Sequence, residues 1–269
     1  MLKVTNITKS FGEFKAINKL SFEIKIGDVM GFLGPNGAGK TTSMRVITQF
    51  LKPDSGSVHI NKININDDPI GSKSLIGYLP EGVPLYQDFS AYLYLKYVAE
   101  VRNLENVEEK IQNILLDLQL DDIKDVPIET LSKGYKRRVG LAQALIHDPK
   151  ILILDEPTDG LDPLQKFEVR RLIKDLSKKK AIIISTHILD EVPEVCNKCL
   201  IINNGEKIFE GTPAQLKKRK GKNLDEVFRE LVVTNEKIFE GTPAQLKKSK
   251  SKSKSKSKKS VKVFRGSPQ

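Results

Sequence analysis

The sequence predicts an α/β domain with a mostly parallel sheet, and two observations lead to this prediction. Short β-branched or aliphatic runs alternate along the chain with longer stretches that have a helical period. A glycine-rich phosphate-binding motif stands where one of the apolar runs passes into a helix-compatible segment. Strands that alternate with helices are typical of parallel sheets, because each strand must be followed by a crossover before the next one.

Four apolar runs have the length and composition of buried strands. They are Val29–Gly34, Ile151–Asp155, Ala181–Thr186 and Leu200–Asn203. Two apolar stripes between or beside them predict amphipathic helices. The first consists of Ile111, Ile114, Leu115 and Leu118. The second is looser, follows Pro163 and consists of Leu164, Phe167, Leu172 and Leu176. Residues 86–144 contain no comparable strand run, so we expect a helical insertion there.

Composition excludes several classes of protein. With 269 residues and 39% apolar content, the chain is long enough to bury a substantial core. No segment approaches the roughly 18 consecutive apolar residues that a membrane-spanning helix needs. The N-terminus lacks the apolar stretch of a signal peptide. Two cysteines without a disulfide-scaffold pattern indicate a reducing, cytoplasmic compartment.

The net charge of +11 is concentrated at the C-terminus. Residues 249–269 hold seven lysines, one arginine and no acidic residue, whereas residues 1–248 carry 37 basic and 34 acidic side chains. The segment Glu206–Lys218 is repeated without a change at Glu236–Lys248, and an alternating Ser-Lys run follows at 249–257. Such low complexity cannot build a core. We expect a domain over residues 1–234, with its helical part at about 86–144, and a disordered extension over 235–269.

The nine residues from Gly34 to Thr42 carry the first chemical signal. They contain the pattern G-x-x-x-x-G-K-[ST] at Gly34, Gly39, Lys40 and Thr41, after an apolar strand and before a helix. Glycines let backbone N–H groups turn toward phosphate oxygens, and a helix N-terminus favours an anion. We expect Lys40 to reach the β- and γ-phosphates of a nucleotide and Thr41 to bind Mg²⁺.

A second signal is the apolar strand that ends in Asp155 and Glu156. Two carboxylates at the end of a parallel strand lie at the edge of the sheet where phosphates bind. Asp155 is suited to hold Mg²⁺, directly or through water. Glu156 is suited to polarise the attacking water. The sequence therefore predicts hydrolysis of ATP, with ATP and Mg²⁺ as cofactors.

With these motifs the chain resembles the nucleotide-binding subunit of ABC transporters over residues 1–218. Leu131-Ser-Lys-Gly-Tyr135 is similar to the LSGGQ signature of that family, although Lys133 and Tyr135 depart from its strict form. The resemblance implies a RecA-like P-loop core, an antiparallel β region near the N-terminus and an inserted helical subdomain. It also implies that Ser132 and the backbone of Gly134 contact ATP bound to a second subunit, so that two subunits enclose two nucleotides.

The same resemblance extends to four further positions. Thr158–Asp162 is similar to the loop through which the family's subunits communicate, and His187 to the histidine that contacts the γ-phosphate. Phe11 is similar to the aromatic residue that stacks on adenine. Glu81 stands where the family usually has the glutamine that contacts the metal, and as a carboxylate it adds negative charge beside Asp155 and Glu156. The full set expected at the nucleotide consists of Phe11, Gly34, Pro35, Asn36, Gly37, Ala38, Gly39, Lys40, Thr41, Thr42, Glu81, Ser132, Gly134, Asp155, Glu156 and His187.

The resemblance implies an ATPase subunit that drives transport through a separate integral-membrane protein, from the inner face of the cell membrane. The LSKGY signature and Glu81 favour export, and the second ATP-binding subunit is expected to be another copy of this chain. Contact with the membrane is expected to be indirect, through the partner. The alternative is a soluble ABC-type ATPase that acts on nucleic acid or ribosomes. The basic tail could bind anionic lipid or RNA, or have no role. A chromosome or repair ATPase is disfavoured because only 92 positions separate Lys40 from Ser132.

The pair Cys196 and Cys199 has the C-x-x-C spacing of some zinc and redox sites. A structural zinc site needs about four ligands, and the chain has no second Cys/His pair. We therefore interpret the two cysteines as small apolar residues at a helix-to-strand junction. His59 and His147 have no motif around them and are expected to be structural.

Overall fold

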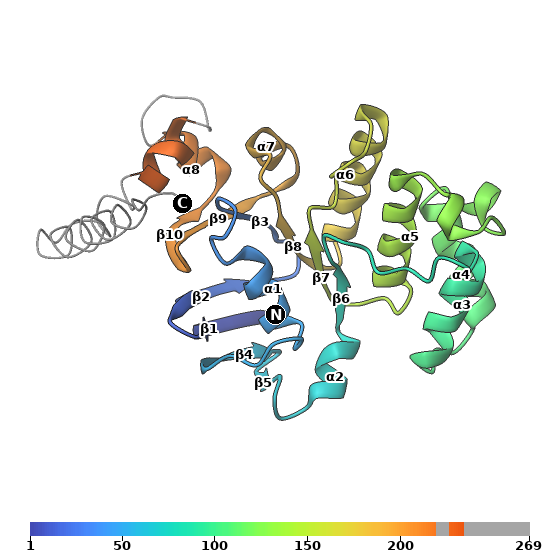
Figure 1. Ribbon diagram of the computed structural model, residues 1–269, viewed down its shortest axis with the longest axis horizontal. Helices are drawn as coiled ribbons and strands as arrows, with labels where there is room; N and C mark the ends of the chain where they lie inside the picture. Colours follow the sequence, from blue (N-terminus) through green and yellow to red (C-terminus); the bar gives the residue numbers. More distant parts are fainter. Residues whose placement is uncertain (219–225, 234–269) are drawn as a thin grey trace, which may run out of the picture.

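The structure is a computed structural model that describes residues 1–218 and 226–233. It holds two sheets and several layers of helix (Figure 1). The second copy of the 13-residue repeat and the Ser-Lys run lie outside the described residues. The first copy of the repeat forms the strand β10 and the helix α8 (Pro213–Lys218), which are part of the fold.

The larger sheet has six strands in the order β10-β9-β3-β8-β7-β6. Five of them are parallel, and β10 pairs antiparallel with β9 at one edge. The bounds of the strands are β3 Val29–Leu33, β6 Ile76–Leu79, β7 Ile151–Asp155, β8 Ala181–Ser185, β9 Lys198–Asn203 and β10 Glu206–Gly211. The four strands predicted from apolar runs are therefore confirmed, with ends that differ by at most two residues.

The large sheet is buried on both faces, which explains its continuous apolar runs. In β3, Val29 and Leu33 join a core between the sheet and the helices, whereas Met30 and Phe32 join a second core toward the smaller sheet. The same alternation occurs in β7 and β8. Side chains on a strand point to opposite faces in turn, so a strand between two cores must be apolar at every position.

The smaller sheet is the antiparallel region expected near the N-terminus. Its order is β2-β1-β4-β5, and its strands are β1 Leu2–Phe11, β2 Phe14–Ile24, β4 Ser55–Ile60 and β5 Ile63–Asn64. In Figure 1 it lies beside α1 and below the larger sheet. Its apolar residues, among them Leu2, Val4 and Ile24, are buried against Met30 and Phe32. This packing fixes the first hairpin beside the segment that follows β3.

Helices cover the remaining faces and form one end of the molecule (Figure 1). Their bounds are α1 Lys40–Ile47, α2 Pro69–Ser74, α3 Ala91–Val101, α4 Val107–Asp117, α5 Lys133–Leu145, α6 Pro163–Ser177 and α7 Val192–Val195, and residues 226–233 are also helical. Of these, α3, α4 and nearly all of α5 lie in residues 86–144, where the described backbone forms no strand. The first predicted stripe is confirmed, because Ile111, Leu115 and Leu118 are buried and Ile114 packs against them.

The second predicted stripe is partly wrong. The inner face of α6 is formed by Val169, Leu172, Ile173 and Leu176, spaced i, i+3, i+4 and i+7. Leu164 and Phe167 are 68% and 60% exposed. Leu164 and Phe167 lie in the first turns of the helix, before this buried face begins, next to the loop at 158–162.

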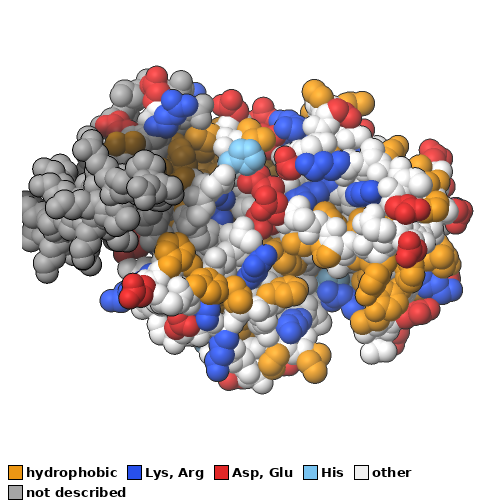
Figure 2. All heavy atoms as spheres, viewed as in Figure 1, with side chains coloured by type: hydrophobic (Ala, Val, Ile, Leu, Met, Phe, Trp, Pro, Cys, Tyr) orange, Lys and Arg blue, Asp and Glu red, His pale blue; other side chains and the backbone are white. Residues whose placement is uncertain are grey.

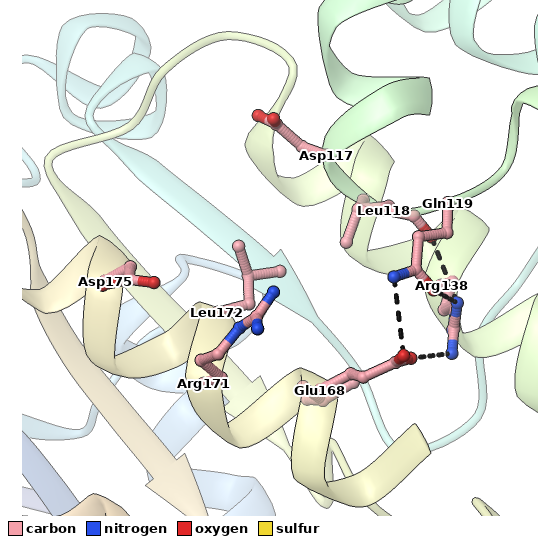
Figure 3. Close-up of a pocket in the computed structure, with 9 residues that line it drawn as sticks. Asp117, Leu118, Gln119, Arg138, Glu168, Arg171, Leu172 and Asp175 are labelled. Carbon is pink, nitrogen blue, oxygen red and sulfur yellow. Dashed lines mark hydrogen bonds and ion pairs between the residues drawn. The ribbon is translucent and has the colours of Figure 1, made fainter. Parts of the chain in front are cut away.

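A polar network around the buried Arg138 joins α5 to α6 (Figure 3). Arg138 forms an ion pair with Glu168 of α6, with 2.7 Å between Nη2 and Oε2, and donates to Oε1 of Gln119 at 3.0 Å. These three side chains line a cavity of about 90 Å³ between α4, α5 and α6. The network holds the helical end of the molecule against the larger sheet.

No helix among residues 1–218 and 226–233 is both long and apolar enough to cross a membrane.

Candidate nucleotide site

The segment between β3 and α1 forms a close-fitting loop at the end of the central strand. Gly39 has φ +103°, and a Cβ there would come within 2.3 Å of the carbonyl oxygen of Ala16. At Gly34 a Cβ would lie 2.4 Å from the carbonyl oxygen of Ile202. Both positions therefore require glycine for steric reasons, and Gly39 also for its left-handed backbone. The loop is wedged against β2 and β9, which directs its backbone toward the start of α1.

Lys40 is the first residue of α1 and is buried, with 9% of its surface exposed. Its Nζ donates to the carbonyl oxygens of Gly34 at 2.7 Å and Pro35 at 3.1 Å. Burial lowers the pKa of Lys40, and the charges of Glu156, Asp155 and Glu81 partly offset that effect. The two hydrogen bonds to the glycine-rich loop hold the ammonium group of Lys40 at the cavity, where it can meet a phosphate.

An open cavity of about 560 Å³ lies in front of this loop. Its walls are Phe14, Ala16, Asn36, Gly37, Gly39, Lys40, Thr41, Thr42, Glu81, Asp155, Glu156, Asp159 and His187. Ten of the sixteen residues expected at the nucleotide thus meet at one cavity. They come from segments that are far apart in the sequence, and the shared edge of the parallel sheet brings them together.

The carboxylates of the cavity suit a divalent cation. Asp155 is 2% exposed; one oxygen, Oδ1, accepts a hydrogen bond from Ser185 Oγ, and Oδ2 is buried without a partner among the described residues. Thr41 and Glu81 line the same cavity. No group of three or more His, Cys, Asp or Glu side chains in the described part of the chain is arranged to hold a metal by itself. The unpartnered Oδ2 of Asp155, at the same cavity as Thr41, suits Mg²⁺, which uses one or two carboxylates together with substrate phosphates and water.

Glu156 combines burial with an unusual backbone conformation. Its φ is +53°, in the left-handed region, which costs a residue other than glycine about 1–3 kcal/mol. One carboxylate oxygen, Oε1, lies 2.9 Å from Nδ1 of His187. Burial raises the pKa of Glu156, although the hydrogen bond from His187 opposes that shift. A carboxylate with a raised pKa that faces the cavity is suited to accept a proton from water.

Six of the expected nucleotide residues do not line the cavity. They are Phe11, Gly34, Pro35, Ala38, Ser132 and Gly134. Ser132 instead caps α5, accepting a hydrogen bond from the N–H of Tyr135 at 3.3 Å. Phe11 pairs with Phe14 across the turn between β1 and β2, and it is Phe14 that reaches the cavity. The roles of these residues at the nucleotide stay predictions.

The signature segment still touches the cavity wall through one ion pair. Lys133 Nζ lies 2.8 Å from Oδ2 of Asp159, and both side chains are at least half exposed. An exposed pair of this kind contributes little to stability and rearranges easily. It brings the start of α5 next to the loop at 158–162, which follows the carboxylates of β7.

Sequence reasoning missed Phe14 and Ala16 as cavity residues, and it did not single out Asp159 or Arg137. Phe14 carried no signal beyond its position on a short hairpin. Arg137 is buried and donates to backbone carbonyls on both loops that border the cavity. Two adjacent arginines in a helix with an otherwise apolar face were the only sequence signal for it.

Comparison with known proteins shows the family to which the chain belongs. The family model described as ABC transporter matches residues 17–159. An uncharacterised ABC transporter ATP-binding protein of Bacillus subtilis, YxlF, is 35% identical over 230 residues, which cover 83% of this chain and 75% of the relative. The bacitracin transport ATP-binding protein BcrA of Bacillus licheniformis is 37% identical and covers 84% and 74%. The Nod factor export ATP-binding protein I of Sinorhizobium fredii is 37% identical and covers 80% and 64%.

Solved structures agree with the sequence relatives. An ATP-binding subunit of an ABC transporter superposes with a TM-score of 0.79 at 27% identity, covering 86% of this chain and 99% of the other. A dimeric ATP-binding cassette, MJ0796, in a post-hydrolysis state with ADP and Pᵢ, gives a TM-score of 0.72 at 25% identity and covers 79% and 99%. The chain belongs to the ABC transporter family, as an ATP-binding subunit with ATPase activity.

Proposed function

We propose that this chain hydrolyses ATP at a site shared with a second copy of itself, and that it drives export through a separate integral-membrane subunit. It works at the inner, cytoplasmic face of the cell membrane and meets the membrane only through that partner. The relatives include ATP-binding proteins of bacitracin transport and of Nod factor export, and the latter supports export as the direction of transport. The substrate would be set by the partner, which lines the path.

The chemistry follows from the residues of the cavity. The glycine-rich loop and Lys40 hold the phosphates of ATP, and Glu156 accepts a proton from water as the water oxygen attacks the γ-phosphorus. The bond from the γ-phosphorus to the bridging oxygen breaks, and ADP leaves with the electron pair. His187 and Lys40 stabilise charge on the transferred group. Mg²⁺, held by Thr41 and Asp155 with Glu81 nearby, would supply further positive charge there.

Two features support a site completed by a second chain. Ser132 and Gly134, expected against ATP, are not part of this chain's own cavity. The loop at 158–162 is followed by Leu164 and Phe167, two large apolar side chains that are exposed in the single chain. Exposed apolar side chains next to a nucleotide site that lacks Ser132 and Gly134 are well suited to an interface with a second chain. ATP would then join the two copies, and hydrolysis would release them.

The position of the loop around Glu81 supports the proposal that ATP hydrolysis is coupled to a membrane partner. Glu81 lines the nucleotide cavity, while its neighbours Pro80 and Gly82 line a second cavity of about 590 Å³. That second cavity is an open groove with Phe50, 72% exposed, and Tyr78 in its wall, their ring centroids 5.9 Å apart. One short loop therefore borders both the ATP site and an apolar groove.

The groove reaches the helical part of the chain, which carries exposed apolar side chains of its own. Pro84 and Arg102, at either end of the segment that holds α3, line the groove. Figure 2 shows apolar side chains gathered over α3, where Leu93 and Tyr97 are 53% and 41% exposed. Exposed apolar area of this kind is typical of sites where another protein binds. It suits a short apolar helix on the inner side of a membrane protein.

The experiment compares the full chain with two surface variants. Affinity capture from gently solubilised host membranes, with ATP present, is expected to recover a protein with several membrane-spanning helices. Phe50→Asp, in the groove, should lose that protein; Ile70→Asp, which alters an apolar side chain 85% exposed and outside the groove, should keep it. Thermal unfolding checks that both variants fold. Recovery of ribosomal or DNA-associated proteins instead would support the soluble alternative and contradict transport.

A further inference from the structure

Arg137, in the second turn of α5, is a buried cation whose hydrogen bonds go to backbone carbonyls. Burial lowers the pKa of Arg137, and the charges of Asp155 and Asp159 partly offset that effect. Its surface is 5% exposed, and among the described residues it forms no ion pair. A guanidinium removed from water is costly unless its N–H groups find acceptors. At this position the acceptors are four backbone carbonyl oxygens, and all four belong to the two loops that carry Glu81 and Glu156.

The guanidinium divides its hydrogen bonds between the loops. Nη1 donates to the carbonyl oxygens of Pro80 at 3.0 Å and Glu81 at 2.6 Å. Nη2 donates to the carbonyl oxygens of Asp155 and Glu156. The fork of a guanidinium is planar and rigid, so it fixes the distance between the two groups of acceptors, whereas a flexible ammonium group does not. One side chain thus sets how the Glu81 loop lies against the end of β7.

The hydrogen bond from Arg137 to Glu156 matters more than those to the Glu81 loop, because the backbone of Glu156 is strained. Its carbonyl oxygen accepts from the N–H of Asp159 at 3.2 Å as well as from Arg137. A left-handed residue persists only where its surroundings hold it. The carboxylate projects from this backbone toward His187, so a change in the carbonyl's position changes where the carboxylate points.

We propose that Arg137 is a positioning residue for ATP hydrolysis: it locks the loops of Glu81 and Glu156 together and ties both to α5, the helix that begins with the signature segment. The inference rests on the proposed function, in which Glu156 is the base and α5 presents Ser132 to a second copy. Arg137 does not touch the nucleotide. It acts through the position of the Glu156 carboxylate and of the Glu81 loop.

Arg138 provides a matched control in the same helix. It is 8% exposed, close to the 5% of Arg137, but it reaches Glu168 of α6 and Gln119 instead of the loops of the cavity (Figure 3). Replacing either arginine by glutamine removes a buried guanidinium from α5. Only the change at position 137 removes bonds to the loops that carry Glu81 and Glu156.

The test measures steady-state ATP hydrolysis, binding of a non-hydrolysable ATP analogue, and thermal unfolding for the full-length chain. Arg137→Gln is expected to lower kcat by about 10- to 100-fold, the usual range for residues that orient a catalytic group, with KM and analogue affinity within about two-fold. Arg137→Lys should restore part of kcat, because an ammonium group retains some of the donors. Arg138→Gln should lower the unfolding temperature and leave kcat near wild type below that temperature.

A double variant separates positioning from general stability. If Arg137 acts through Glu156, then adding Arg137→Gln to Glu156→Gln lowers kcat little beyond the single Glu156→Gln change.

Wild-type kcat in a folded Arg137→Gln protein would overturn the inference. Equal losses of kcat in Arg137→Gln and Arg138→Gln would also overturn it. Should Arg137→Gln not fold, Arg137→Lys replaces it, and a kcat equal to wild type in that variant overturns the inference. Wild-type kcat in Glu156→Gln alone would instead contradict the proposed function.

Discussion

His187 Nδ1 lies 2.9 Å from Oε1 of Glu156, so the two residues after neighbouring parallel strands meet at the wall of the cavity. His187 is 59% exposed at its side chain, whereas Glu156 is 11% exposed. The histidine can therefore move toward a bound phosphate, while the carboxylate is held by the protein. This contact joins the residue that we assign as base to the residue that we expect to meet the γ-phosphate.

Replacing Glu156 by glutamine should separate binding from turnover. Glutamine keeps the shape of the side chain and removes its ability to accept a proton. We expect ATP affinity near wild type and kcat lower by roughly 10²–10⁴-fold, the range for loss of a general base. Equilibrium binding and single-turnover hydrolysis measure the two quantities. Unchanged hydrolysis would remove Glu156 from the role.

The same substitution should stabilise the folded chain at neutral pH. Burial raises the pKa of Glu156 above its ordinary value of 4.5, so ionisation of this carboxyl destabilises the fold: the loss begins as the pH rises through 4.5 and is complete above the raised pKa. The neutral glutamine avoids this cost. We expect Glu156→Gln to unfold at a higher temperature than wild type at pH 7, and the difference to shrink as the pH falls below 4.5. A constant difference across that range would contradict the raised pKa.

Hydrolysis should also depend on pH through Glu156. The base acts only when ionised, so kcat/KM is expected to rise with pH as the carboxylate of the free enzyme loses its proton. Because burial raises the pKa of Glu156, the midpoint of this acid limb should lie above 4.5. A profile of kcat/KM in wild type checks this, because kcat/KM reports the pKa values of the free enzyme. The residual activity of Glu156→Gln should show no such limb, and an identical limb in both proteins would assign it to another group.

Lys40→Ala should weaken nucleotide binding itself. A charged hydrogen bond to phosphate contributes roughly 1.5–3 kcal/mol, so we expect the affinity for ATP to fall by about 10- to 100-fold. Lys198→Ala is a suitable control: Lys198 lies at the opposite end of the parallel strands, paired with Asp28 at 2.8 Å. Calorimetry measures both affinities. Wild-type affinity in Lys40→Ala would contradict the assignment of the glycine-rich loop.

His147 should make the fold sensitive to mild acid. Its Nε2 contacts the carbonyl oxygen of Ile76 at 3.0 Å, and burial lowers the pKa of His147 to about 4. An unfolded histidine titrates near 6.5, so the stability that the neutral ring provides is complete above pH 6.5 and is lost as the pH falls toward 4. Urea unfolding of wild type and His147→Asn should converge over this range. Parallel pH dependences would contradict the lowered pKa.

The cysteines should behave as buried thiols. Burial raises the pKa of Cys196 to about 12 and that of Cys199 to about 11. The thiolate is the reactive form, so alkylation at pH 8 should be slow until the chain unfolds. Rapid labelling of the folded chain would contradict this interpretation.

The sequence predicted the elements whose signals are local. The strands ending at Leu33 and Asp155 are buried on both faces, so an uninterrupted apolar run identified them. The loop from Gly34 to Thr42 was predicted because its glycines, lysine and threonine form one contiguous phosphate-binding pattern.

Prediction was weaker where contacts are distant in the chain. The start of α6 was misjudged because Leu164 is apolar yet exposed, and nothing within the helix distinguishes it from a core residue. Arg137 contacts carbonyls that are 18 to 57 residues away. Every residue has a backbone carbonyl, so the residue types do not indicate which ones accept. Phe14 reaches the cavity only because of how the hairpin at Phe11 folds back.

The measurement that tests the account most directly is the mass of the Glu156→Gln protein in solution, with and without ATP and Mg²⁺. A site completed by a second copy predicts one chain without nucleotide, two chains with ATP, and one chain again with ADP. Adding Ser132→Ala or Lys40→Ala should prevent the doubling. A single-chain mass at saturating ATP, with nucleotide bound, would contradict a shared site.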